Sequence, residues 1–486
     1  MIKRIIVDQE NYSLKKNTQK GLIWSTAGNI ANQGIRFVFG VILARLLSPN
    51  DYGAIGILAV FMSVVSVFID CGFSQALIRK QDRTQKDFST EFLFNIVVGI
   101  LGYLILYVTA PLIAKFYDMP ILTSVLRVLS LGIIINSFCV VQSAQFAIRL
   151  DFKTPAKLAV STQLFSGVIG ITMAYCGWGI WALVFQQVSG SLLNAILLWI
   201  LAGWRPTLEF SKESFRYLWG YGSKILGASL IQQIYDNIYP LVIGKAFTAS
   251  ILGLYSRAQG FASLPSGNIS GVLSNVTFPI LCKIANDEKR LVDTYRRMIK
   301  STAFIVFPLM IGMAASASPI VKMLLNEQWY GCIILLQLLC FALIWQPLSS
   351  LQLNVLKIIG RTDVVLKLEI YKRSFGLLTI FMSIPFGVIG MCIGFILFYV
   401  YSFSLNTYFI SRILRFSFRH QIMDLFPLWF NSIVMGGLVW SLTFIPINNI
   451  FLFMLCIVVG TVYYYVSSRL LNCEVLYDTI SLLKNR

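Results

Sequence analysis

The sequence predicts an all-α integral membrane protein with about 14 transmembrane helices, arranged as two pseudo-symmetric six-helix lobes plus two C-terminal helices. Three observations lead to this fold class. The 486 residues are 57% hydrophobic and only 13% charged, with a mean hydropathy of +0.74, whereas soluble domains are about 25% charged. The apolar residues fall into long runs, and two parts of the chain resemble each other. The bilayer is therefore the solvent for most of the protein.

Fourteen apolar stretches are long enough to span a membrane, because a spanning helix needs about 20 mostly apolar residues. Their length and lack of polar alternation exclude β-strands. In chain order the expected spans are residues 20–46, 53–79, 91–114, 121–148, 157–176, 178–202, 217–244, 251–281, 299–324, 332–356, 365–385, 387–411, 425–445 and 449–471.

The loops between these spans differ strongly in basic charge. Of the 40 Lys and Arg residues, most lie in the termini and in the loops on the same side. The opposite side holds only Arg45, Lys115, Lys245, Arg257 and Lys322, and three more cations, Arg36, Arg127 and Lys224, fall inside spans. Since Lys and Arg stay on the cytoplasmic side, both termini of this multi-pass protein are predicted to be cytoplasmic.

Several functions are disfavoured by what the sequence lacks. The net charge of +19 is spread over short loop clusters, so no nucleic-acid partner is expected. The single histidine, His420, and dispersed cysteines form no metal motif, and no nucleophile or phosphate-loop motif is present. The sequence therefore predicts a protein that is not an enzyme and has no cofactor and no metal site.

An internal repeat occurs at an offset of 200 residues. VILARLLSPNDYG (41–53) aligns with LVIGKAFTASILG (241–253), which matches Arg45 with Lys245 and Gly53 with Gly253. The copies begin in the first and seventh spans, so they have the same orientation in the membrane. We therefore expect an N-terminal lobe over 1–205 (helices 1–6), a C-terminal lobe over 206–412 (helices 7–12), and an interfacial segment with helices 13–14 over 413–486.

Charged and polar residues inside the spans are the candidates for function, because a charge near the bilayer centre costs at least about 2.5–3.5 kcal/mol. Arg36 lies about ten residues, or roughly 15 Å, from the external end of its helix, and Asp236 lies at the matching depth of helix seven. Both could face one cavity between the lobes, and a structural salt bridge is an equal alternative. The substrate-cavity candidates are Arg36, Lys224, Gln232, Gln233, Asp236, Asn237, Arg257 and Asn268.

Helix eight is the least lipid-like span, since its first two-thirds contain Arg257, Ser266 and Asn268. Pro265 and Gly267 also weaken the backbone hydrogen bonding of this helix. A hinge, a cavity wall or a bundle-core helix would all fit this composition. Two connections are also charged: residues 283–300 are expected to be a solvated helical connector, and residues 412–419 to lie along the lipid interface.

The cations predict an anionic cargo, because guanidinium groups pair bidentately with phosphate oxygens. The deep carboxylates Asp70 and Asp236 leave room for a coupling ion, H⁺ or Na⁺. The matched helix-end cations Arg45 and Lys245 complete the set of candidate residues.

A family resemblance rests on seven stretches in the right order. They are ARLLSPNDYGAIGI (44–57), DCGFSQALIRK (70–80), STEFLFN (89–95), YDNIYPLVIGKAFTASILGLYSRA (235–258), LPSGNISGVLSNVTFPIL (264–281), NEQWYGCIILLQLL (326–339) and LNVLKIIGR (353–361). Together they resemble the Wzx-type flippases of the multidrug/oligosaccharidyl-lipid/polysaccharide (MOP) exporter superfamily, and they cover roughly residues 20–365.

This resemblance implies two six-helix lobes around a central cavity that opens alternately to the cytoplasm and the periplasm. The implied cargo is an undecaprenyl-diphosphate-linked oligosaccharide repeat unit for O-antigen, capsule or exopolysaccharide synthesis, with its lipid tail left among the membrane lipids. A polysaccharide polymerase and chain-length proteins are the implied partners. Two other functions stay open: a cation-coupled multidrug exporter of the same superfamily, and a membrane-embedded polymerase or ligase, which the short external loops disfavour.

Overall fold

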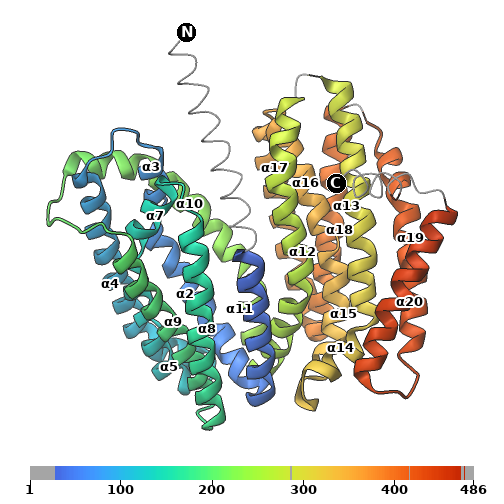
Figure 1. Ribbon diagram of the computed structural model, residues 1–486, viewed down its shortest axis with the longest axis horizontal. Coiled ribbons are helices and arrows are strands. Elements are labelled where there is room, and N and C mark those ends of the chain that lie inside the picture. The colour runs from blue at the N-terminus through green and yellow to red at the C-terminus, as the bar shows by residue number, and fades with distance from the viewer. Residues whose placement is uncertain (1–27, 285–286, 415, 472–475, 477–486) are drawn as a thin grey trace. The chain divides into compact units, whose positions relative to one another are not determined.

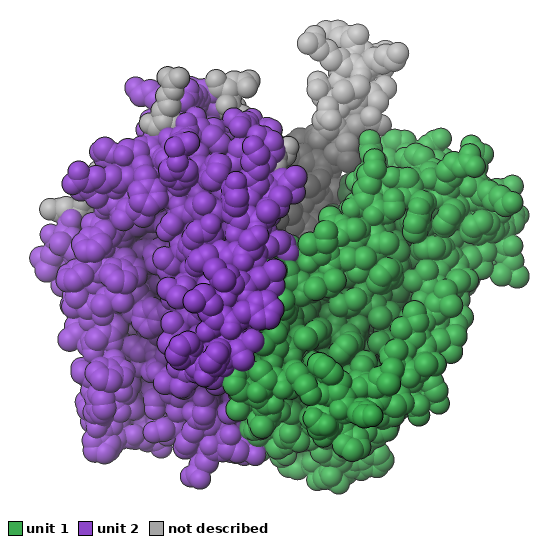
Figure 2. Space-filling view, turned by 180° about the vertical axis from the view of Figure 1, so that it is seen from behind, with its two compact units in different colours: residues 1–253 green, residues 254–486 purple. Residues whose placement is uncertain are grey.

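The structure, a computed structural model, describes residues 28–284, 287–414, 416–471 and 476, and the described part of the chain contains helices and no strand. Both termini lie outside the described residues, so the prediction that they are cytoplasmic concerns residues beyond them. The chain divides into two compact units, residues 1–253 (unit 1) and 254–486 (unit 2), which are coloured separately in Figure 2.

Unit 1 contains a helix over residues 28–46 and the following helices. They are α2 (Pro49–Asp70), α3 (Phe73–Arg79), α4 (Gln85–Phe116), α5 (Ile121–Leu129), α6 (Leu131–Ser137), α7 (Val140–Ile148), α8 (Lys153–Tyr175), α9 (Ile180–Leu201), α10 (Lys212–Asp236) and α11 (Ile238–Ala246). The helix α12 (Ala249–Lys283) begins in unit 1 and continues into unit 2.

Unit 2 is built from antiparallel helices that run roughly side by side (Figure 1). They are α13 (Glu288–Ala315), α14 (Ala317–Leu324), η1 (Glu327–Trp329), α15 (Cys332–Leu343), α16 (Gln346–Ile358), α17 (Thr362–Ser383), η2 (Ile384–Phe386), α18 (Gly387–Ile413), α19 (Phe418–Leu442) and α20 (Asn449–Leu470). The pairs α13–α19, α17–α18 and α15–α18 make the most extensive contacts in this unit.

Among the described residues, nine helical stretches are long and apolar enough to cross a membrane, or ten if the bent pair Ile121–Ser137 and Val140–Ile148 is one span. One of them, Asp363–Ile413, is long enough for two of the predicted spans. Large apolar side chains such as Val108 and Phe451 point outward, about 70% exposed, as expected where lipid is the solvent. The predicted all-α membrane fold is confirmed, and the number of fourteen helices stays a prediction.

Five predicted spans are not the single helices expected from sequence, and one of them, 121–148, divides into α5, α6 and α7. Span 53–79 is α2 and α3, separated at Cys71 and Gly72, which both have a left-handed backbone (φ 45° and 69°). Span 217–244 breaks at Asn237 between α10 and α11, span 299–324 divides into α13 and α14, and span 332–356 divides into α15 and α16. At Gly72 the side chain of Ile225 on α10 packs against the break, which the apolar pattern alone does not record.

Two charged connections also differ from expectation. Residues 288–300, expected to be part of a solvated connector, are the first turns of α13 and continue without interruption into its membrane part. Residues 412 and 413 end α18, and residues 418 and 419 begin α19, so the described part of 412–419 forms no separate interfacial helix. In both places a membrane helix extends beyond its apolar core by several charged turns.

Unit 1 extends further along the chain than the predicted N-terminal lobe. Helix α10 follows residue 205, yet it packs against α2, α3 and α4. The contact is close, because a Cβ at Gly222 would lie 2.6 Å from the Cys71 carbonyl oxygen. The lobes over 1–205 and 206–412 are defined by the repeat rather than by contacts, and they stay a prediction.

The two copies of the repeat touch each other reciprocally within unit 1. A Cβ on Gly53 would lie 1.7 Å from the Ala249 carbonyl oxygen, and a Cβ on Gly253 would lie 1.9 Å from the Pro49 carbonyl oxygen. Pro49 matches Ala249 and Gly53 matches Gly253 in the repeat. Equivalent residues of the two copies therefore contact each other in the same way, as they would across a two-fold axis. This contact supports the repeat, and it requires glycine at both positions.

Candidate transport site

The cations and amides predicted to line a cavity lie on helices that are less apolar than the rest. The nine apolar stretches do not include the helix over 28–46, α10 or α12. Arg36 lies on the first of these helices and Lys224 on α10, and both side chains are exposed. A cation on a membrane helix faces headgroups or an aqueous space, because exposure to acyl chains is costly. Each position therefore marks a polar side of its helix.

Asp236 is held by its own helix. Gln232 Nε2 lies 2.8 Å from both carboxylate oxygens of Asp236, one helical turn away, and donates to them. Asn237 Nδ2 donates to the Gln233 carbonyl oxygen at 2.8 Å, where α10 ends. Within the described part of unit 1, no ion pair joins Arg36 to Asp236. Arg36 is exposed, and its role in binding an anion stays a prediction.

Of the two matched helix-end cations, Lys245 has a structural role in unit 1. Its Nζ donates to the Phe116 carbonyl oxygen and lies 3.7 Å from the Asp118 carboxylate and 4.6 Å from the centre of the Phe116 ring. These contacts join α11 to the end of α4. Arg45 is exposed in the last turn of the helix over 28–46.

Arg257 lies in the third turn of α12, close to two aromatic rings. Its guanidinium carbon is 5.6 Å from the centre of the Phe261 ring and 5.7 Å from that of Trp329, and Trp329 is fully buried. Aromatic faces stabilise a cation without neutralising it. Arg257 is therefore held in place as a charged group.

The middle of α12 is continuous helix through Pro265 and Gly267. Ser266 Oγ donates to the Leu343 carbonyl oxygen at 3.0 Å and lies 2.9 Å from Gln346 Oε1, which fixes α12 to the junction of α15 and α16. Asn268 is exposed, and its Nδ2 donates to the Leu264 carbonyl oxygen at 2.8 Å. Of the structures weighed from the sequence, the described contacts favour a wall or core helix over a hinge here.

The structure thus groups part of the predicted set. Lys224, Gln232, Gln233, Asp236 and Asn237 follow one another along α10 and its end in unit 1, whereas Arg257 and Asn268 lie on α12 in unit 2. Asp70 is the last residue of α2, and its side chain lies outside the described part of the structure. That all of them face one cavity stays a prediction.

Sequence reasoning missed a set of buried polar residues in unit 1. Asp87, Glu91 and Asn95 on α4 and Gln142 on α7 are at most 1% exposed. A signal was available, because residues 87, 91 and 95 recur at four-residue spacing, which places them on one helix face. The strongly apolar remainder of α4 concealed it.

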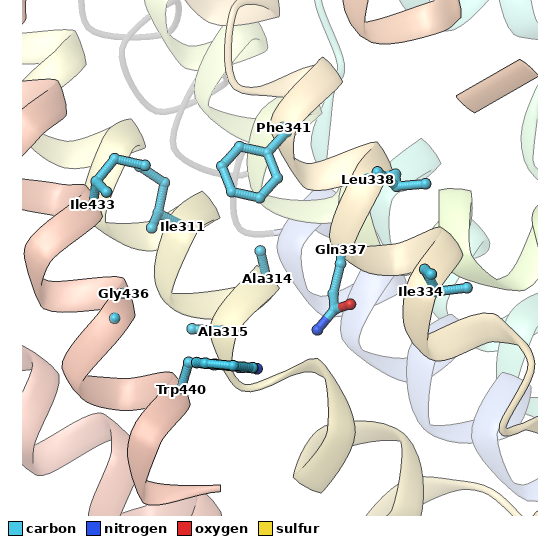
Figure 3. Close-up of a pocket in the computed structure, with 11 residues that line it drawn as sticks. Ile311, Ala314, Ala315, Ile334, Gln337, Leu338, Phe341, Ile433, Gly436 and Trp440 are labelled. Carbon is cyan, nitrogen blue, oxygen red and sulfur yellow. The ribbon is translucent and has the colours of Figure 1, made fainter. Parts of the chain in front are cut away.

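An apolar pocket in unit 2 was also missed (Figure 3). It lies between α13, α15 and α19, and Gln337 is the one polar side chain among its eleven lining residues. Phe341 and Trp440 border it from α15 and α19. A pocket with this lining has no cation to bind a phosphate, so it is separate from the predicted cargo site.

Comparison with known proteins decides the family. The model of the polysaccharide biosynthesis protein family matches residues 42–334, which is more than half of the chain. The chain belongs to this family. Among its relatives, the lipopolysaccharide biosynthesis protein WzxC of Escherichia coli (strain K12) is 24% identical over 422 residues, covering 85% of each chain. The teichuronic acid biosynthesis protein TuaB of Bacillus subtilis (strain 168) is 26% identical, over 82% of this chain and 86% of its own.

The fold of this polysaccharide biosynthesis protein is also found in solved transporters. The structure of the lipid II flippase MurJ in an inward closed conformation superposes with a TM-score of 0.76 at 16% identity, over 92% of this chain and 98% of MurJ. An inward-facing multidrug resistance MATE family transporter of the MOP superfamily gives a TM-score of 0.60 at 16% identity, over 79% of this chain and 96% of its own. The expected resemblance to Wzx-type proteins is thereby confirmed by the relative WzxC, and the solved transporters confirm the fold.

Proposed function

We propose that the protein is a flippase that moves an undecaprenyl-diphosphate-linked oligosaccharide repeat unit from the cytoplasmic to the periplasmic leaflet by alternating access. The observation that carries this proposal is the family match, together with relatives aligned over most of both chains whose names are those of surface-polysaccharide biosynthesis proteins. The flippase fold neighbour supports it, since that structure is covered almost completely. The product is a surface polysaccharide, and the protein is a transporter rather than an enzyme.

The charges of the described residues fit such a cargo. Arg36 and Lys224 are exposed cations on polar membrane helices, and Arg257 keeps its charge close to two aromatic rings. A diphosphate offers several anionic oxygens, and guanidinium groups bind these in pairs. In unit 1 we assign the diphosphate to Arg36 and the glycan to the amides of Gln232, Gln233 and Asn237. Arg257 and Asn268 of unit 2 are assigned a phosphate contact and a glycan contact of their own.

The proposal also assigns a place and partners. The multi-pass protein lies in the bacterial inner membrane with both termini in the cytoplasm, as the loop charges favour. The two predicted lobes move relative to each other during transport, and a coupling ion, H⁺ or Na⁺, drives the cycle. A polysaccharide polymerase with its chain-length partner consumes the translocated unit.

Replacing Arg36 with alanine tests the role of this exposed charge on a membrane helix. Purified protein is reconstituted into vesicles that contain a fluorescent lipid-linked oligosaccharide, and translocation is followed by protection from a membrane-impermeant quencher. A charge-assisted hydrogen bond contributes about 1.5–3 kcal/mol, so Arg36→Ala and Arg257→Ala should each reduce the translocation rate about tenfold or more. Arg36→Lys should retain part of the rate, because the charge remains while the bidentate geometry is lost.

Arg361→Ala is the matched control, since Arg361 is an exposed cation outside the apolar stretches, bound to Asp363 at 3.0 Å. It should translocate like the unchanged protein. Equal rates for Arg36→Ala, Arg257→Ala and the unchanged protein, at equal membrane abundance, would refute the assigned roles. Failure of the unchanged protein to translocate any lipid-linked oligosaccharide would refute the flippase itself.

A cation-coupled multidrug exporter is the second candidate, favoured by the MATE fold neighbour and by the exposed carboxylate of Asp236. The two functions differ in what a deletion strain loses. Loss of surface polysaccharide with unchanged drug susceptibility indicates the flippase, whereas drug hypersensitivity with intact polysaccharide indicates the exporter.

A further inference from the structure

Helix α4 carries a row of buried polar side chains, Asp87, Glu91 and Asn95, which we call the α4 polar ladder. Asp87 is 1% exposed, and Glu91 and Asn95 are fully buried. The four-residue spacing places all three on one face of the helix. Asp87, at the beginning of α4, is bound by Lys80 at 2.8 Å. The ladder therefore leads from a charged helix end into the interior of unit 1.

Two further helices enclose the middle of the ladder. Ser74 on α3 donates from its Oγ to Glu91 Oε1 at 2.9 Å. Helix α7 packs against both α3 and α4, and α3 packs against α4. Gln142 on α7 is fully buried. Helices α3, α4 and α7 thus meet at a place where one carboxylate, one hydroxyl and two amides lie in the interior of unit 1.

The register of α4 against α6 and α7 places Gln142 near Glu91. A Cβ on Gly99 would lie 2.7 Å from the Cβ of Ser137, and two turns nearer the start of α4 the rings of Phe92 and Phe138 have centres 5.9 Å apart. Phe92 also packs with Val141 in one buried cluster. Gln142 directly follows Val141, and Glu91 directly precedes Phe92, so Gln142 lies at the level of the turn between Glu91 and Asn95.

The two amides have unused polar atoms. Within the described part of the chain, neither the oxygen nor the nitrogen of the Asn95 and Gln142 side chains has a hydrogen-bond partner. Buried polar atoms are almost always satisfied, and an exception indicates a bound water or ion that supplies the missing contacts. An occupant that contacts both amides is therefore expected at this position.

The donor set indicates the kind of occupant. A carboxylate, a hydroxyl and amide oxygens are hard ligands, which prefer hard cations. The set contains one carboxylate, which balances one positive charge. No group of three His, Cys, Asp or Glu side chains that could hold a metal occurs among the described residues. A monovalent metal ion matches this site in both ligand type and charge.

We propose that Ser74, Glu91, Asn95 and Gln142 form a binding site for a monovalent metal cation inside unit 1, with Na⁺ as its probe. Its four residues do not include Asp70 or Asp236, to which the sequence assigned ion coupling. Binding follows from the side chains alone. Only the further step, that this cation drives transport, rests on the proposed function.

Thermal unfolding of the purified full-length protein in detergent tests the site. The unfolding midpoint is measured in NaCl and in choline chloride at equal ionic strength. A ligand that binds the folded state alone stabilises it, so saturating Na⁺ should raise the midpoint by about 2–4 °C. Glu91→Gln, which retains the contact with Ser74 but removes the charge, and Gln142→Leu should both abolish the increase.

Asn406→Leu provides the matched control. Asn406 is a fully buried amide of α18 in unit 2, and its side-chain atoms have no partner among the described residues, so its replacement should leave the sodium effect unchanged. If a variant does not fold, binding of radioactive sodium to the unchanged protein, displaced by unlabelled Na⁺, still decides whether the cation binds. Equal midpoints in NaCl and choline chloride, or a sodium effect that persists in Glu91→Gln, overturns the site. Neither result affects the flippase assay.

Discussion

The ion pair between Lys80 and Asp87 shows how single residues hold the end of a membrane helix. Lys80 Nζ donates to both carboxylate oxygens of Asp87, at 2.9 and 2.8 Å. The same carboxylate accepts from the Thr84 backbone N–H at 2.7 Å and completes a capping box for α4. The hydrogen bond with Asp87 raises the pKa of Lys80 above its usual value, although burial alone would lower it. The pair therefore begins α4 and covers the outer end of the polar ladder.

We predict that Asp87→Ala lowers the free energy of unfolding by about 1.5–3 kcal/mol, because it removes a charge-assisted hydrogen bond and a helix cap together. Unfolding is measured in mixed micelles titrated with a denaturing detergent. Since the pKa of Lys80 is raised by folding, its contribution is complete below the unfolded pKa of about 10.4 and disappears as the pH rises through the folded value.

The control is Glu209→Ala, because Glu209 pairs with Lys86 at 3.7 Å on the surface, where both side chains are more than half exposed. Its effect should stay within about 0–1 kcal/mol. Equal losses in the two variants would contradict a special role for the buried carboxylate.

Sequence reasoning found the exposed polar residues and missed the buried ones for a physical reason. Arg36, Asp236 and Arg257 are ionisable residues on weakly apolar helices. The free energy required to place such a charge in lipid makes these residues stand out in the sequence. Asn95 and Gln142 are uncharged and surrounded by apolar neighbours. Only the packing of α7 against α4 shows that these two side chains are buried without partners.

At the scale of the element, every predicted span is mostly helix in the described residues, because each apolar run must satisfy its backbone internally. The breaks were not predictable in the same way. At Gly72 a Cβ would lie 2.8 Å from the Cβ of Ile225, so the turn between α2 and α3 is shaped by a residue far along the chain. The charged extension of α19 was missed because hydropathy does not distinguish a polar helical turn from a loop. Residues 283–300 were expected to be helical, but their continuity with the membrane part of α13 was not.

We predict that Gly53→Ala disrupts the crossing of α2 and α12 in unit 1. The added methyl would overlap the Ala249 carbonyl group, and overpacking of this kind typically costs about 1–3 kcal/mol. The unfolding midpoint and the translocation rate should both fall, and Gly253→Ala should have the same effect because the contact is reciprocal.

Gly260→Ala is the matched control on the same helix, α12, because no heavy atom lies within 4 Å of the position its Cβ would take. It should be neutral or slightly stabilising, since alanine favours helix by about 1 kcal/mol over glycine. A Gly53→Ala protein as stable and active as Gly260→Ala would show that the crossing adapts without cost.

At the scale of the whole molecule, the sequence predicts orientation from charge, and two native cysteines test it. Cys176, at the turn between α8 and α9, and Cys282, near the end of α12, are exposed, whereas the other cysteines of the described chain are buried. The predicted orientation places Cys176 outside and Cys282 in the cytoplasm.

In variants that retain only one of these cysteines, a membrane-impermeant maleimide should label Cys176 in cells stripped of their outer envelope. Cys282 should react only after the membrane is permeabilised. The reverse pattern would invert the topology, and labelling of both in sealed cells would contradict the number of spans between them.

The domain organisation was the least accessible from sequence. The repeat places a boundary near residue 205, but the contacts of α10 with α2 and α3 extend unit 1 to residue 253. Similarity between two segments shows that they match in sequence. It does not show which neighbouring helices a segment packs against, so the unit that contains α10 was not predictable from the repeat.

The position of the polar ladder within α4 also bears on how the chain is inserted during synthesis. Residues 96–113, which follow the ladder, contain no charged side chain, so the translocon recognises this helix by its later part. Ser74 has already been made when Glu91 emerges and can bind it at once, but Gln142 arrives some fifty residues later. Nascent α4 must therefore retain water around its first turns until α7 reaches it.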